Sequence, residues 1–199
     1  MRKTGILMHI SSLPSNYGIG TMGKESYRFI DFLAGSGQSY WQVLPLNPTS
    51  YGDSPYQSPS AFAGNPYFID IDFLIEEGLL TQAEADNYFF GSSENEIDYY
   101  LLFQNRYPLL RTAFKRFTKT DDYYSFLNEN SFWLDEFALF MALKEENHFR
   151  SWIYWDEPYR KHEPAAMDSA KERLAHEKEV CGVYISGSNR SHSCNQGVP

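Results

Sequence analysis

A stretch rich in proline and tyrosine, PLNPTSYGDSPYQSPSAFAGNPYFIDI at residues 45–71, carries the side chains whose types are best suited to chemistry. Flat rings with hydroxyls alternate there with hydrogen-bonding groups: Tyr51, Asp53, Ser54, Tyr56, Gln57 and Tyr67. Sugars present C–H faces and hydroxyl edges, which match this set. Because prolines fix φ, such a loop can hold its rings in place before a ligand arrives. The stretch therefore indicates sugar contact, with the alternative that the tyrosines only cover the mouth of the fold.

Two predicted strands and one predicted helix position this stretch. The apolar run GILMHI (residues 5–10) is typical of a buried strand, and YWQVLPL (residues 40–46) is typical of a second strand. Between them, residues 24–37 show apolar side chains at helical spacing and end in Gly35 and Gly37. This order predicts a βαβ unit with parallel strands and a right-handed crossover. The stretch then leaves the C-terminal end of a strand, where α/β folds carry their functional groups.

Helical patterns follow this stretch. TQAE at residues 81–84 fits a capping box, and residues 134–141 place apolar side chains at the i, i+3, i+4, i+7 positions of an amphipathic helix. We therefore expect an α/β chain in three parts: a βαβ unit with the substrate-contact loop (1–71), a helical insertion (72–180) and a tail (181–199).

The tail, CGVYISGSNRSHSCNQGVP, differs in composition from the rest of the chain. It has no acidic residue and a single Arg, and it holds both cysteines. We expect it to be irregular and disordered. The alternative is that the coding frame is lost after Val180, so that the tail is not evolved protein.

The composition argues against several classes of protein. A net charge of −9 and a pI near 5.0 oppose binding to nucleic acid. The sequence has no apolar run long enough for a membrane span, and its first residues make a poor signal peptide, so we expect a cytoplasmic protein without a membrane partner. Because the cysteines are confined to the tail, neither a disulfide framework nor a zinc site is expected.

Three blocks of the sequence resemble the N-terminal part of the 4-α-glucanotransferases, the amylomaltase or disproportionating-enzyme family. They are HISSLPSNYGIGTMG, YWQVLPLNPTSYGDSPYQSPSAFAGNPY and WLDEFALFMALKE, and the resemblance covers residues 5–180. It implies the first two strands of a (β/α)8 TIM barrel with a large helical insertion. It also implies transfer of α-1,4-glucan segments between maltooligosaccharides, or starch or glycogen fragments, by a retaining double displacement without metal or organic cofactor. The partners would be α-1,4-glucan oligosaccharides, and the oligomeric state stays open.

The resemblance also assigns roles to particular side chains. Within GDSPYQS, Ser54 and Tyr56 would contact sugar in the cleft. Tyr51 and Phe103 would stand where the family can have aromatic residues of a secondary glucan site, although Phe103 lacks the hydroxyl of a tyrosine. His9 ends the first predicted strand, where the family often has a histidine. A ligand contact there is one interpretation, and a packed, hydrogen-bonded histidine is the other.

No catalytic residue is assigned, because the catalytic acids that the resemblance implies lie on later barrel strands that this chain lacks. A retaining mechanism needs two carboxyl groups about 5–5.5 Å apart. No motif marks Asp53, Asp70 or Asp72 as one of them, and Asp53 is more simply a turn-forming residue before Ser-Pro. We therefore expect an N-terminal fragment that is inactive alone. The alternatives are a non-catalytic glucan-binding fragment or pseudogene product, and a chain that reassembles with a second one.

Overall fold

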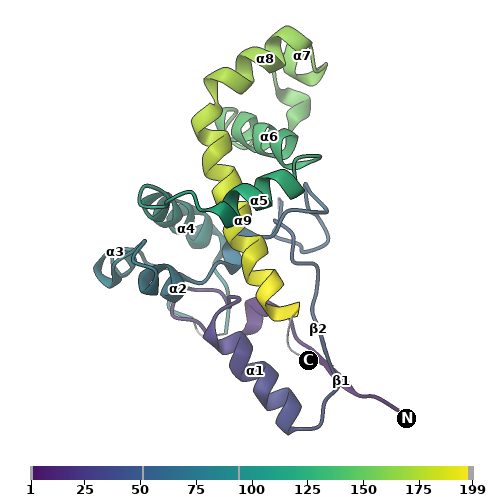
Figure 1. Cartoon of the computed structure of the whole chain (residues 1–199), viewed down its shortest axis with the longest axis vertical. Helices are drawn as coiled ribbons and strands as arrows, with labels where there is room; N and C mark the ends of the chain where they lie inside the picture. Colours follow the sequence, from purple (N-terminus) through teal and green to yellow (C-terminus); the bar gives the residue numbers. More distant parts are fainter. Residues whose placement is uncertain (1, 51, 94, 197–199) are drawn as a thin grey trace. The chain divides into compact units, whose positions relative to one another are not determined.

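A computed structural model describes residues 2–50, 52–93 and 95–196, and the chain divides into two compact units (Figure 1). The first unit comprises residues 1–118 and 187–199, and the second comprises residues 119–186. The last helix, α9 (Ala175–Gln196), contributes residues to both units. Among the described helices, none is long and apolar enough to cross a membrane.

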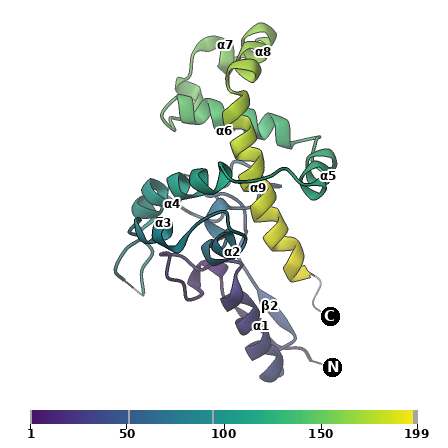
Figure 2. The same ribbon diagram turned by 60° about the vertical axis from the view of Figure 1, so that its left-hand side comes forward.

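The first unit begins with the predicted βαβ arrangement. Strands β1 (Gly5–Leu7) and β2 (Tyr40–Gln42) pair in parallel, with Gly5 opposite Tyr40. Helix α1 (Lys24–Gly35) connects them and lies alongside the strands in both views (Figure 1, Figure 2). The indole of Trp41 donates to the carbonyl of Met8 at 2.7 Å, which ties the end of β1 to β2. The parallel βαβ unit is therefore confirmed, while closure into an eight-stranded barrel stays a prediction.

Both strands are shorter and more exposed than the sequence predicts. Pairing ends with the bond from the Met8 amide to the Gln42 carbonyl, after which the chain enters the 3-10 turn η1 (Ile10–Ser12). The side chains of Leu7 and Tyr40 are 58% and 57% exposed. The prediction that the first strand is buried is thus wrong in this structure, because burial depends on what packs against a strand and not on its apolar character alone.

Short helices complete the first unit around an apolar core. They are η2 (Pro66–Phe68), α2 (Ile71–Glu76), α3 (Gln82–Asp86) and α4 (Tyr99–Phe114). The capping box that opens α3 is confirmed, because the Thr81 hydroxyl accepts from the amide of Glu84, whose carboxylate in turn accepts from the amide of Thr81. Fully buried side chains of this unit come from η1, α2 and α4: Ile10, Ile71, Leu102, Arg106 and Leu109.

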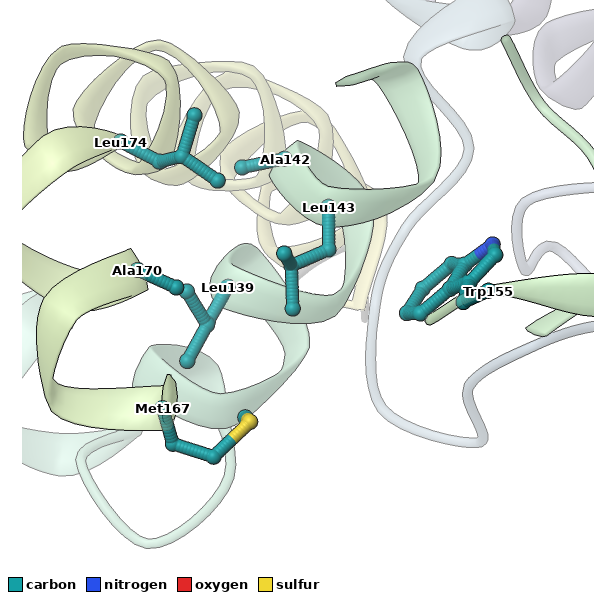
Figure 3. Packing of buried hydrophobic residues seen from close by; sticks show 7 residues of the cluster. All are labelled: Leu139, Ala142, Leu143, Trp155, Met167, Ala170 and Leu174. Carbon is teal, nitrogen blue, oxygen red and sulfur yellow. The ribbon is translucent and has the colours of Figure 1, made fainter. Parts of the chain in front are cut away.

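The second unit is helical. It contains α5 (Asp121–Glu129), α6 (Leu134–Glu146), the 3-10 turn η3 (Trp152–Tyr154), α7 (Glu157–Arg160), α8 (Pro164–Arg173) and the first part of α9. Its core joins α6 to α8, and Figure 3 shows Leu139 facing Ala170 and Met167. The helix predicted from residues 134–141 is confirmed. It buries more of its circumference than an amphipathic helix would, since Leu139 and Leu143 are buried as well as Leu134 and Phe137.

The tail does not have the irregular structure that the sequence predicts. Residues 181–196 continue α9, and residues 197–199 lie outside the described part of the chain. Extending an existing helix costs far less than starting one, and Ile185 and Ser188 are buried along it. The predicted division of the chain at residues 71 and 180 stays a prediction.

Candidate functional site

The proline-rich and tyrosine-rich loop leaves β2 and is closed at its base by hydrogen bonds. The amide of Asn65 donates to the carbonyl of Leu46 at 2.9 Å, and the side-chain amide of Asn47 donates to the carbonyl of Ala63 at 3.0 Å. We call residues 43–65, which these bonds close, the lip loop. Its returning end is held further by α9, since Asn189 Oδ1 accepts from the amide of Gly64 at 2.8 Å.

Turn hydrogen bonds fix the outer part of the lip loop. The Ser50 amide donates to the carbonyl of Gln57, and the amide of Asp53 donates back to the carbonyl of Ser50, both at 3.0 Å. Gly52 and Asp53 have φ values of 85° and 52°, in the left-handed region that glycine and aspartate tolerate best. Asp53 is thus a turn residue, as the sequence indicates. Its carboxylate accepts from the Thr49 hydroxyl at 3.2 Å, and burial raises its pKa while this bond opposes the rise.

Two of the side chains predicted to contact sugar lie together on this fixed part of the loop. The Ser54 hydroxyl accepts from the backbone amide of Tyr56 at 3.3 Å, which orients the segment that carries the tyrosine. The Tyr56 side chain is 73% exposed, so its ring face is open to solvent. Tyr51, the third predicted residue of this loop, lies outside the described residues.

An aromatic cluster joins the C-terminal side of the lip loop to α4. The ring of Tyr67 lies 5.7 Å from that of Tyr107 and 6.4 Å from that of Tyr99, and Phe103 packs edge-on against Tyr107 at 5.8 Å. We call these four residues the aromatic cluster. Tyr67 is buried, whereas Phe103 is 37% exposed at the surface. Phe103 therefore belongs to a set of rings, and its role in a secondary glucan site stays a prediction.

Tyr99 and Tyr107 were not singled out in the sequence, although a signal was present. With Phe103 they follow an i, i+4, i+8 spacing, which places all three rings on one face of a helix. Burial raises the pKa of both Tyr67 and Tyr99, and the negative charge of Asp53 raises both further.

His9 is packed but not fully hydrogen-bonded. Its ring meets Phe68 edge-on at 5.4 Å, and its buried Nδ1 has no hydrogen-bond partner within the described part of the chain. Burial lowers its pKa, so the neutral imidazole is favoured. The packed interpretation accounts for the ring contact, and the ligand contact stays a prediction.

Asp70 and Asp72 are engaged in structural hydrogen bonds. Asp70 caps α2 by accepting from the amide of Phe73 at 3.0 Å, and its second oxygen accepts from the Thr21 hydroxyl. Asp72 accepts from the Tyr17 hydroxyl at 2.8 Å. Within the ranges that the structure covers, no group of three or more His, Cys, Asp or Glu side chains could hold a metal ion. The geometry is that of an aromatic, hydroxyl-rich surface.

Comparison with known proteins gives a consistent result. Residues 8–184 match a family described as 4-alpha-glucanotransferase. A 4-alpha-glucanotransferase of Streptococcus pneumoniae is 48% identical over 178 residues, and one of Thermus thermophilus is 43% identical over 182 residues. These matches cover 87% and 88% of this chain and 35% of each relative, so the chain spans about a third of their length.

A solved structure is similar over nearly the whole chain. It is described as amylomaltase from Streptococcus agalactiae in complex with acarbose, and it superposes with a TM-score of 0.91 at 39% identity. The superposition covers 96% of this chain and 39% of that chain.

Proposed function

Because the chain belongs to the 4-alpha-glucanotransferase family, we propose that its lip loop and aromatic cluster bind α-1,4-glucans. In this proposal the family's activity is the transfer of glucan segments between maltooligosaccharides or fragments of starch or glycogen. In this proposal β1 and β2 are the first two strands of a (β/α)8 barrel. The lip loop then follows the C-terminal end of the second barrel strand.

The observation that carries the proposal is the exposed ring of Tyr56 on a loop whose backbone is already fixed. Its side chain is 73% exposed, and turn hydrogen bonds hold the segment around it. A glucan that stacks on this ring orders little additional chain, which lowers the entropic cost of binding. The Ser54 hydroxyl accepts from the backbone amide of Tyr56, and in this proposal it also hydrogen-bonds the sugar.

The aromatic cluster supports a second contact with the same polymer. Phe103 exposes part of its ring on α4, and Tyr107 packs against it and against Tyr67. A platform of several rings suits a helical glucan, whose successive residues present apolar faces. Phe103 stacks its ring on the glucan in this proposal, but it has no hydroxyl to form a hydrogen bond with the sugar.

We infer that this chain binds glucan without transferring it when it is present alone. A retaining double displacement needs a carboxylate nucleophile and a carboxylic acid about 5–5.5 Å apart. Asp70 and Asp72 are already hydrogen-bonded to the fold, and Asp53 accepts from Thr49 at the turn. These bonds hold the three carboxylates in structural positions, so none of them is assigned the role of nucleophile.

Two measurements on the purified chain test the proposal. Calorimetric titration with acarbose or maltotriose should detect binding, and Tyr56→Ala should weaken it by about threefold to tenfold through loss of ring stacking. Tyr100→Ala is the matched control, since this tyrosine is 71% exposed on α4 but outside the ring contacts of the aromatic cluster. Equal affinity of wild type and Tyr56→Ala would remove the basis of the proposal.

The second measurement is incubation with maltotriose followed by chromatography of the products. We expect neither glucose nor longer maltooligosaccharides to form. Formation of both would show transfer and would contradict the inference that the chain alone binds glucan without transferring it.

A further inference from the structure

A cavity of about 370 Å³ opens in the second unit, far along the sequence from the lip loop. It is lined by one face of α5, the first turns of α6 and the first half of α9, all within residues 119–186. Neither the lip loop nor the aromatic cluster contributes to it. Its volume suits one or two sugar residues rather than a long chain.

Two ion pairs line this cavity and leave it electrically balanced. Lys119 pairs with Glu179, and Lys178 pairs with Asp135, each with an N–O distance of 2.5 Å. The Lys178 side chain is only 16% exposed, so its ammonium group is held in place beside the cavity. A charged ligand would meet repulsion as well as attraction here. A neutral polyhydroxylated ligand can instead donate to the carboxylates and accept from the ammonium groups.

Apolar groups form another part of the lining. The ring of Tyr124 is 55% exposed and lies 5.9 Å from the buried ring of Tyr123, at an angle of 58°. Leu127 and Ala138 add aliphatic surface. An exposed aromatic face beside fixed charged groups matches a sugar, which carries a C–H face and hydroxyl edges.

Gly182 of α9 keeps this space open. A Cβ placed there would lie 3.4 Å from the Tyr123 hydroxyl and 4.0 Å from Leu127 Cδ2, which are ordinary contact distances. Alanine therefore fits at this position, whereas a larger side chain would extend into the cavity. A larger residue in place of Gly182 would therefore fill the cavity without forcing the backbone of α9 to move.

We propose that this cavity is a second carbohydrate site, which binds the end of a neutral oligosaccharide. The choice of an α-1,4-glucan among such ligands rests on the function proposed above. The Tyr124 ring stacks on the sugar, and the Lys178–Asp135 pair hydrogen-bonds its hydroxyls.

Titration of the full chain with maltotriose, with glucose and with glucose 6-phosphate tests the site. Gly182→Leu should weaken maltotriose binding by about tenfold or more by filling the cavity, and Tyr124→Ala by about threefold or more by removing the ring. Gly182→Ala controls for substitution at the helix position and should fold normally by circular dichroism. Tyr154→Ala controls for loss of a surface tyrosine in the same unit, since that side chain is 73% exposed and outside the cavity.

The binding results for these variants distinguish a site in the cavity from a site at the lip loop. Binding that survives Tyr56→Ala but is weakened by Tyr124→Ala and Gly182→Leu supports the cavity, even if the lip-loop proposal fails. Binding that is lost only with Tyr56→Ala supports the lip loop and overturns the cavity site. Absence of maltotriose binding up to about 10 mM, or tighter binding of glucose 6-phosphate than of glucose, also overturns it.

Discussion

Replacing Arg106 should destabilise the first unit and loosen the segment that carries Tyr67. Arg106 is completely buried in α4, and its guanidinium donates to the backbone carbonyls of Tyr17 and Ile69. It therefore connects three parts of the chain that are distant in sequence. Burial lowers its pKa and the nearby charge of Asp70 raises it. Arg106→Met keeps most of the apolar stem and removes both bonds.

The size of the effect follows from the two carbonyl groups left without a donor. The bond to Ile69 is short, and the bond to Tyr17 is weak at 3.4 Å. A hydrogen bond from a charged group contributes about 1.5–3 kcal/mol, and a buried acceptor without a partner costs about 1–3 kcal/mol. Because removing the guanidinium also removes its own desolvation cost, we expect the free energy of unfolding to fall by about 2–4 kcal/mol.

Urea denaturation followed by circular dichroism measures this loss. Arg28→Met is the matched control, since the Arg28 side chain is 74% exposed and pairs only with Glu25 among the ion pairs described, and it should change stability by less than about 1 kcal/mol. Hydrogen exchange by mass spectrometry should show faster exchange around Tyr17 and Ile69. Unchanged stability together with unchanged exchange in Arg106→Met would refute the argument that the guanidinium holds these backbone segments.

Two further predictions concern acid sensitivity and the core of the second unit. Bonds from Arg116 and Thr81 lower the pKa of Glu84 to about 2, so its stabilising contribution is present above its ordinary pKa and is lost as the pH falls toward 2. Glu84→Gln should therefore lose less stability than wild type on acidification, as measured by thermal unfolding at a series of pH values, and parallel curves for the two proteins would contradict this. Leu139→Ala should lower the free energy of unfolding by about 2–5 kcal/mol, because the side chain is fully buried in the cluster of α6 and α8. The control Ile153→Ala, at a side chain that is 49% exposed in the same unit, should cost clearly less in the same urea denaturation, and equal losses would contradict the core assignment.

Features set by short-range rules could be predicted from the sequence. The capping box at Thr81 and Glu84 depends on a spacing of three residues, and α6 depends on apolar periodicity within a few turns. The parallel pairing of β1 and β2 follows from one helix between two apolar runs. For the capping box and α6 the information lies within the segment itself, and for the strand pairing it lies in the order of three consecutive segments.

Features that depend on distant neighbours could not be predicted. Leu7 lies in an apolar run and is nevertheless exposed, while Arg106 belongs to a residue type that is usually exposed and is fully buried. The continuation of α9 through residues 181–196 depends on burial of Ile185 and Ser188, which the tail composition does not reveal. In the candidate site, Tyr67 contacts Tyr99 and Tyr107, which lie on α4 more than 30 residues later. The sequence shows that Tyr99 and Tyr107 share a face of this helix, but it does not show that Tyr67 packs against them.

The attachment of the lip loop to α9 has a consequence for the order of events during synthesis. The Gly64 amide finds its acceptor 125 residues later in Asn189, and the Asn65 carbonyl finds its donor 123 residues later in Ser188. At a translation rate of about 5–20 residues per second, roughly 6–25 s separate the emergence of the two sides. Until Ser188 and Asn189 have emerged, water must solvate the Gly64 amide and the Asn65 carbonyl. The lip loop, although it lies early in the chain, is therefore among the regions whose geometry is completed late.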